Sequence, residues 1–146
     1  MKINFTDNSK EILYKFAKAK ERGLKAIGMT AEGYAKKELG KAQKHASGPD
    51  RPYIDTGRLR NDISHATQGN DVYIGTNVEY APWVELGTGI YASDGQGRKD
   101  VPWVYQDAEG KWHSTSGIMP VHFLKKAATE HGDEYRELME KSMKNG

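Results

Sequence analysis

The chain contains no cysteine, and this absence excludes several kinds of chemistry. Disulfide bonds, thiol nucleophiles and thiolate metal sites all require cysteine. Long hydrophobic runs are absent too, since no stretch approaches the roughly 20 consecutive apolar residues that a membrane-spanning helix needs. The first residues lack the basic-then-apolar order of a signal peptide. We therefore expect a protein that is made and kept in a cytoplasm and has no membrane partner.

Charge is unevenly distributed along the 146 residues, although the net charge is only +2. Residues 1–46 carry eleven Lys/Arg against five Asp/Glu, whereas residues 47–118 carry six against ten. Such a polarity favours attraction between copies of the chain, or a weak attraction of the basic segment to nucleic acid. The simpler alternative is a solvated helical surface. The length fits one domain over residues 1–146.

Residues 1–46 are predicted to form one long basic helix. Asp7 to Ser9 supply N-cap residues, and apolar or small residues then recur mostly every three or four positions. Glycines within the segment each cost about 1 kcal/mol relative to alanine, so we expect a kink near residues 28–30, with Thr30 capping a second segment. The recurring apolar or small positions make a stripe along one side of the helix: Ile12, Phe16, Ala19, Gly23, Ala26, Ile27, Thr30, Tyr34 and Leu39.

Residues 53–118 are predicted to form a sheet region. Alternating patterns and turn residues indicate hairpins over residues 63–76 and 101–115, and Pro82 fits the first turn of a short helix. The glycine-rich residues 87–100 form a variable loop. Residues 119–146 are predicted to form a C-terminal helix that begins at Pro120. The fold class is therefore α+β, with a long N-terminal helix and a C-terminal helix packed on a small antiparallel sheet built from two hairpins.

Catalytic motifs are missing from the sequence. No two histidines lie four residues apart, as on a zinc-protease helix, and no G-x-S-x-G occurs. Carboxylate pairs such as Glu79 with Glu85 are inevitable among twenty acidic residues. A small hydrolase using such a pair is our third hypothesis. We expect no enzyme activity, no cofactor and no metal site.

Three segments resemble one known family: DTGRLRNDI at residues 55–63, IGTNVEYAPWVELGTG at residues 74–89, and MPVHFLKKA at residues 119–127. In this order they are similar to the neck, head–tail joining and tail-completion proteins of long-tailed bacteriophages and prophages. Residues 90–118 match least. The resemblance implies a virion structural protein at the head–tail junction or tail end, which is assembled in the bacterial cytoplasm.

The implied partners are other copies of the chain, in a ring of six, and phage connector, neck or tail-tube proteins around DNA in a channel. The candidate subunit-interface or motif residues are Asp55, Thr56, Gly57, Arg58, Leu59, Arg60, Glu79, Tyr80, Trp83, Glu85, Gly87, Thr88, Gly89, Pro120, Phe123 and Leu124.

Several of these residues also have a predicted physical role. Asp55 or Thr56 caps a helical turn, Gly57 permits tight packing, and Leu59 and Ile63 anchor the turn to the core. Gly87 and Gly89 permit positive φ angles.

The longer side chains have predicted contacts as well. Arg58 and Arg60 clamp a carboxylate, with Glu79 or Glu85 as the partner. Tyr80, Trp83 and Leu86 pack inward, and Phe123 and Leu124 seat the last helix.

The second hypothesis is a nonspecific DNA-binding protein that uses the lysines between Lys10 and Lys44. Aromatic residues that stack on bases would strengthen it, but Tyr91, Trp103 and Trp112 lie in the acidic middle of the chain. Affinity that falls steeply with salt concentration would distinguish this hypothesis from the first.

Overall fold

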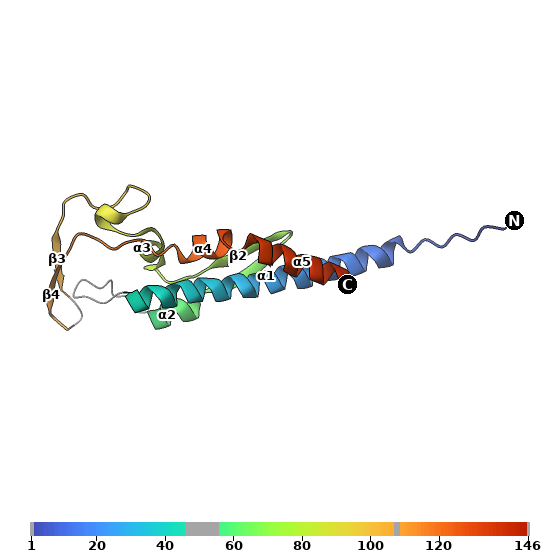
Figure 1. The fold of residues 1–146 in the computed structure, drawn as a ribbon, viewed down its shortest axis with the longest axis horizontal. Helices are drawn as coiled ribbons and strands as arrows, with labels where there is room; N and C mark the ends of the chain where they lie inside the picture. The colour runs from blue at the N-terminus through green and yellow to red at the C-terminus, as the bar shows by residue number, and fades with distance from the viewer. Residues whose placement is uncertain (1, 46–55, 107–108, 146) are drawn as a thin grey trace.

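The computed structural model describes residues 2–45, 56–106 and 109–145. Helix α1 (Ser9–His45) runs along most of the elongated molecule, and α2 (Thr56–Asp62), α4 (Phe123–Thr129), α5 (Gly132–Lys144) and the first hairpin lie beside it (Figure 1). The α+β class predicted from the sequence is confirmed.

Helix α1 is continuous over its 37 residues, or about 55 Å at 1.5 Å per residue. The predicted kink is therefore wrong, and Thr30 donates its hydroxyl to the Ala26 carbonyl inside the helix instead of capping a second one. Two of the glycines instead allow close packing. A Cβ at Gly28 would lie 2.5 Å from the His65 ring, and one at Gly23 would lie 2.6 Å from the Met139 sulfur.

The predicted first hairpin is present and packs against α1. It follows the short helix α2 (Thr56–Asp62) and consists of antiparallel strands β1 (Ser64–Gln68) and β2 (Asp71–Gly75), with His65 opposite Ile74. Gly69 adopts a φ of 60° in its two-residue turn, a conformation that suits glycine.

The second hairpin is also present, but it does not join the first. Helix α3 (Ala81–Leu86) and the single turn η1 (Gly89–Tyr91) precede strands β3 (Trp103–Gln106) and β4 (Trp112–Thr115). The two hairpins form separate two-stranded sheets, so the predicted single sheet is corrected. In Figure 1 the second hairpin stands at the end of the molecule opposite the N-terminus.

The C-terminal helix is divided into α4 (Phe123–Thr129) and α5 (Gly132–Lys144), and both contact α1. The chain turns at His131, whose ring stacks on Tyr34 of α1 at 3.4 Å between centroids. Pro120 does not begin the helix, contrary to the prediction. It lies in an extended segment next to Val121, whose N–H donates to the Val84 carbonyl at 2.9 Å.

The hydrophobic core is small and lies on the C-terminal half of α1. Leu59, Ile63 and Phe123 are almost completely buried there, as predicted, and Leu124 packs partly against them. The buried members of this cluster are Ala35, Leu39, Leu59, Ile63, Val78, Ala81, Val84, Phe123 and Ala127.

Candidate interaction surfaces

Arg58 forms the predicted carboxylate clamp with Glu79 of the same chain. Its two terminal nitrogens donate to the two Glu79 oxygens at 3.2 and 3.0 Å. The Glu79 backbone N–H, and then Arg58, hold the pKa of this carboxyl below its usual value. The Arg58 guanidinium also lies 5.8 Å from the Tyr80 ring centroid. Both charged side chains are exposed, so the pair is a surface contact.

Other residues of the segment at positions 55–63 do not lie as the sequence predicted. Arg60 is exposed, and the structure gives it no partner among the described residues. Gly57 is exposed as well, so the prediction of tight packing at this glycine is wrong. Thr56 is the first residue of α2, while Asp55 lies outside the described residues.

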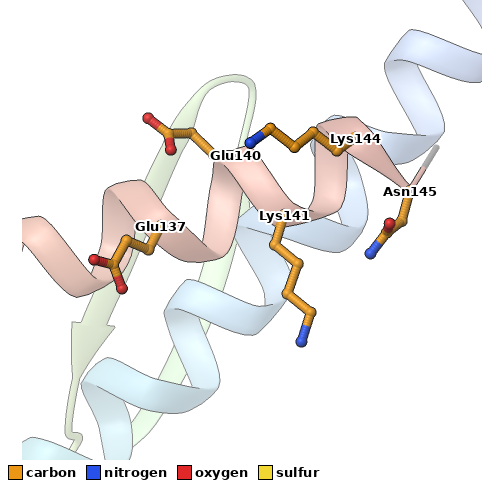
Figure 2. A pocket seen from close by; sticks show the side chains of 5 residues that line it. All are labelled: Glu137, Glu140, Lys141, Lys144 and Asn145. Atoms are coloured by element: carbon orange, nitrogen blue, oxygen red, sulfur yellow. The ribbon is translucent and has the colours of Figure 1, made fainter.

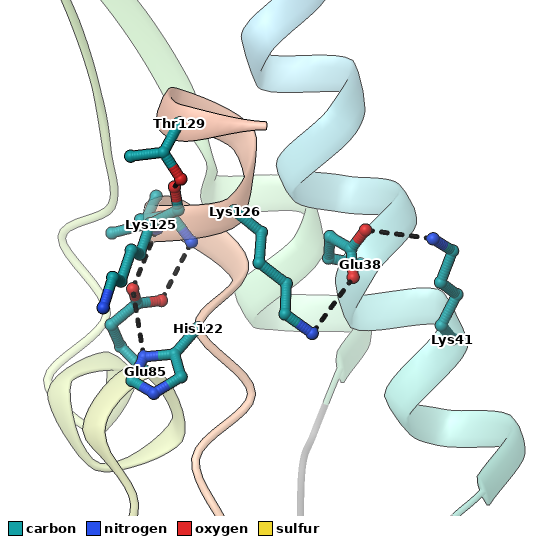
Figure 3. A network of polar contacts seen from close by, with 8 residues as sticks. Glu38, Lys41, Glu85, His122, Lys125, Lys126 and Thr129 are labelled. Atoms are coloured by element: carbon teal, nitrogen blue, oxygen red, sulfur yellow. Dashed lines mark hydrogen bonds and ion pairs between the residues drawn. The ribbon is translucent and has the colours of Figure 1, made fainter. Parts of the chain in front are cut away.

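Glu85 holds the start of α4 and does not bind either arginine. Its two oxygens accept hydrogen bonds from the backbone N–H groups of Leu124 and Lys125, both at 2.9 Å (Figure 3). Its side chain is only 14% exposed, and Nδ1 of His122 lies 4.0 Å from it. The carboxylate therefore compensates free N–H groups at a helix start, where the helix dipole favours negative charge.

A second carboxylate in Figure 3 ties α4 to α1. Glu38 is the buried charged residue of α1, and its oxygens lie 3.0 Å from the Lys41 ammonium and 3.8 Å from that of Lys126. Glu85 and Glu38 thus fix α4 from two sides.

Gly87 and Gly89 adopt the predicted positive φ angles, 80° and 60°. The structure adds a second reason for glycine here. The Thr88 N–H donates to the Ile118 carbonyl at 2.9 Å, and a Cβ at Gly89 would lie 2.0 Å from the Ser116 carbonyl oxygen. Two backbone segments, around residues 88 and 117, therefore pair too closely for a side chain.

Trp83 points away from the core, contrary to the prediction. Ala81 and Val84, three residues apart on α3, are the residues that face the core, which turns Trp83 and Leu86 to the opposite side. The Trp83 side chain is 60% exposed. Tyr80 packs partly against the core, as expected.

Four exposed apolar residues lie on α3 or on the segments that follow or pair with it. The N–H groups of Gly87 and Ser93 donate to the carbonyls of Trp83 and Leu86, respectively, which connects α3 to the following loop. The loop also pairs with residues 116–118. We call these exposed side chains the α3 patch: Trp83, Leu86, Ile90 and Met119.

A second exposed apolar surface lies at the N-terminal end of α1, which extends beyond α5 in Figure 1. The body covers α1 only from Ala19 onward, where the Ser142 hydroxyl donates to the Ala19 carbonyl at 2.6 Å. We call residues 2–18 the arm. Ile12, Leu13 and Phe16 in the arm are 64%, 67% and 55% exposed, so the first two residues of the predicted stripe, Ile12 and Phe16, have no cover in this chain.

The second hairpin also exposes apolar side chains. Val104 and Trp112 lie on its exposed face, while Tyr105 and His113 stack on the other at 5.2 Å between ring centroids. An isolated two-stranded hairpin is only marginally stable in water, which indicates that this element benefits from a partner surface.

Four of the nine lysines in α1 pair with acids of the same helix. Surface ion pairs three or four residues apart are common on helices and partly neutralise the positive surface. These pairs are Glu11–Lys15, Lys18–Glu21, Glu32–Lys36 and Glu38–Lys41.

Sequence reasoning missed two polar contacts between α1 and the rest of the chain. Nδ1 of His65 lies 2.6 Å from the Glu32 carboxylate, and hydrogen bonds from Lys36 first, then His65, lower the pKa of Glu32. The Tyr34 hydroxyl donates to Glu134 of α5, and this bond raises the pKa of Tyr34. The partners lie 33 and 100 residues apart, so no local pattern reveals them.

A shallow polar groove of about 370 Å³ lies on α5 (Figure 2). Its lining residues belong to the last part of this helix and to the residue that follows it: Glu137, Glu140, Lys141, Lys144 and Asn145. Two acids and two lysines line it, so their charges balance. Among the described residues, no group of three metal-ligating side chains gathers, and no helix is long and apolar enough to cross a membrane.

Comparisons with protein-family models, curated proteins and solved structures found no match for this chain. The resemblance to phage tail components therefore stays a prediction that rests on the sequence motifs.

Proposed function

We propose that this chain is a structural protein of a phage or prophage virion, which acts at the head–tail junction or tail end by assembling into a ring. The observation that supports the proposal best is the presence of uncovered apolar side chains in two separate regions of an elongated molecule. Contiguous exposed apolar surface on a soluble protein marks an interaction site. The sequence motifs supply the phage context.

A contact between two different surfaces of neighbouring copies is heterologous. Such contacts form a closed ring when the rotation from each copy to the next adds up to a full turn. The arm occupies one end of the molecule, and the α3 patch and second hairpin lie toward the other (Figure 1). A ring of six copies around DNA follows from the resemblance. The second hairpin is then available to connector, neck or tail-tube proteins. This function depends on shape and contacts and requires no reaction.

Native mass spectrometry from low to high micromolar concentration, at low and moderate salt, tests the proposal. We expect a discrete closed species, such as a hexamer, in equilibrium with the monomer. A chain that stays monomeric at every concentration, or that grows into species of unlimited size, contradicts ring assembly by this protein alone.

The second candidate function is nonspecific DNA binding by α1, which the excess of positive charge over residues 1–46 favours. Binding through phosphate contacts falls linearly with log salt concentration, with a slope that follows the number of phosphates contacted. Titration of a labelled duplex at several salt concentrations measures that slope. Because acids pair four of these lysines, we expect a shallower slope than the lysine count gives.

A further inference from the structure

Residues 2–6 carry the pattern of a strand but belong to neither sheet that the structure describes. In Figure 1 they stretch away from the start of α1. Two apolar residues, Ile3 and Phe5, alternate with polar ones, which is typical of a strand with one apolar face. Ile3 and Phe5 are 81% and 89% exposed, the largest values among the exposed large apolar side chains. The segment therefore has the composition and conformation of a strand that lacks its sheet.

The second hairpin, in turn, lacks a third strand. Within the described residues β3 and β4 form a sheet by themselves, so the outer edge of each strand offers backbone N–H and C=O groups to a further strand. The register places Val104 and Trp112 on the same face, and both side chains are exposed. Two strands are marginally stable, whereas three strands with a covered apolar face are stable. A strand that brings apolar side chains to this face would complete the sheet.

The edge of β4 is the better acceptor of such a strand. Pro102 immediately precedes β3, and proline, which has no N–H, is one of the residues that protect an edge from pairing. On β4, Trp112 and Ser114 lie two residues apart on the exposed face, the same spacing as Ile3 and Phe5. A strand beside β4 thus places either Ile3 or Phe5 next to the Trp112 ring. Aromatic pairs and pairs of an aromatic with a β-branched residue both stabilise neighbouring strands.

The first hairpin fits the segment less well. The side of this hairpin that carries His65 and Ile74 is occupied by α1 and the core. Its outward side presents Tyr73 opposite Ala66, with polar or small residues on either side of them. It therefore offers less apolar surface to Ile3 and Phe5 than the second hairpin does.

The strand that completes the second hairpin comes from another copy, because the chain cannot fold back far enough. Helix α1 has 37 residues and is about 55 Å long at 1.5 Å per residue. Residues 2–8 precede this helix, and the second hairpin stands at the opposite end of the molecule (Figure 1). A fully extended segment of this length spans at most about 25 Å. Residues 2–6 therefore do not reach the hairpin of their own chain.

We infer that residues 2–6 of one copy add to β4 of a second copy as the third strand of its sheet, with their apolar side chains on the face of Trp112. The inference rests on the proposed self-assembly and names a contact that produces it. In this mode of recognition the backbone hydrogen bonds supply affinity, and the side chains select the face and the register. Donor and acceptor lie at opposite ends of the molecule, so each copy donates one strand and receives another. Such a contact is heterologous.

The absence of cysteine allows a direct test of this pairing. A Ser114→Cys preparation is mixed under mild oxidation with a preparation that carries Ile3→Cys or Phe5→Cys, and mass spectrometry measures the disulfide-linked mixed dimer. We expect this dimer with at least one of the two partners, since one of them lies opposite Ser114 in the added strand. Asn4→Cys is the matched control. It lies between the two but on the other face of the strand, so it should give less than about one tenth of the product.

Two results overturn the inference. A mixed dimer that is no more abundant with Ile3→Cys or Phe5→Cys than with Asn4→Cys shows that residues 2–6 do not pair as a strand with β4. Dimers of two Ser114→Cys chains that exceed the mixed product show that the hairpins of two copies pair with each other instead.

A second pair of variants separates this inference from ring assembly itself. The double variant Ile3→Ser/Phe5→Ser should weaken self-association at least about tenfold, the effect of losing two buried apolar side chains. Asn4→Ser/Thr6→Ser, on the other face, should change it less than about threefold. Sedimentation equilibrium measures both, and circular dichroism verifies that each variant folds.

The two proposals fail in different ways. If the unaltered chain forms a closed ring and Ile3→Ser/Phe5→Ser does not weaken it, the strand contact is wrong and the ring stands. If the mixed cross-link forms but the chain assembles into open-ended species, the strand contact stands and the ring is wrong.

Discussion

Replacement of Glu85 by alanine tests whether a single carboxylate holds α4 on the body. The substitution removes both acceptors at the start of α4, where Leu124 and Lys125 donate their N–H groups at 2.9 Å. The Lys125 residue is exposed, so its N–H recovers a hydrogen bond to water. The Leu124 N–H is half-buried beside the core and loses its partner.

The expected loss combines two known effects. Removal of a helix cap costs about 0.5–2 kcal/mol, and a hydrogen bond to a charged group contributes about 1.5–3 kcal/mol. The partial burial of the carboxylate opposes these terms, because a desolvated charge is costly. With one N–H returned to water, we expect Glu85→Ala to lower the free energy of unfolding by about 2 kcal/mol. For a chain of this size the corresponding decrease in Tm is about 4–8 °C.

Urea denaturation followed by far-UV circular dichroism measures this loss as a lower midpoint at constant slope. Glu79→Ala is the matched control, because it removes a carboxylate that lies near α3 and is exposed, and we expect a much smaller shift. Glu85→Gln keeps one acceptor and should fall between the two. A midpoint for Glu85→Ala that equals that of Glu79→Ala would refute the role assigned to Glu85, and a higher midpoint would show that desolvation dominates.

Three further predictions concern backbone and charge. Gly89→Ala places a Cβ against the Ser116 carbonyl at a positive φ and should cost at least about 2 kcal/mol, measured as a lower Tm. Gly33→Ala, in an exposed position of α1 with open space around it, should instead raise stability by about 1 kcal/mol; a loss at Gly33 would contradict the packing described. The hydrogen bond from Thr76 lowers the pKa of Asp62 below 3.8. Its contribution to stability is therefore complete above pH 3.8 and is lost as the pH falls through the lower folded value, so Asp62→Asn should flatten the pH dependence of unfolding below pH 3.8.

Local sequence patterns predicted most of the elements. The spacing of apolar residues in the first third of the chain predicted α1. The alternation of apolar with other residues, together with turn residues, predicted both hairpins. Positive φ at Gly87 and Gly89 followed from the chemistry of glycine. These features depend on residues close together in the chain, where geometry and propensity act directly.

Features that depend on distant residues were not predictable. The three-residue spacing of Ala81 and Val84 competes with that of Trp83 and Leu86, and the side of α3 that is buried depends on core residues distant in the sequence, such as Phe123. The partner of Glu85 lies 39 residues away. The periodic stripe of α1 likewise contains nothing that marks Ala19 as the point where the body stops covering the helix.

Residues 88 and 118 are hydrogen-bonded to each other. The long segment between them therefore leaves the rest of the molecule and returns to it at almost the same place. The segment between them, which includes the η1 turn and the second hairpin, is attached to the body at Thr88 and Ile118 and by the hydrogen bonds from Ser93 to the Leu86 carbonyl. Its length and sequence are therefore free to change without altering the core around Phe123. An architecture of this kind separates a fixed scaffold from an inserted segment, so that changes in the segment can alter what the protein contacts while the scaffold is kept.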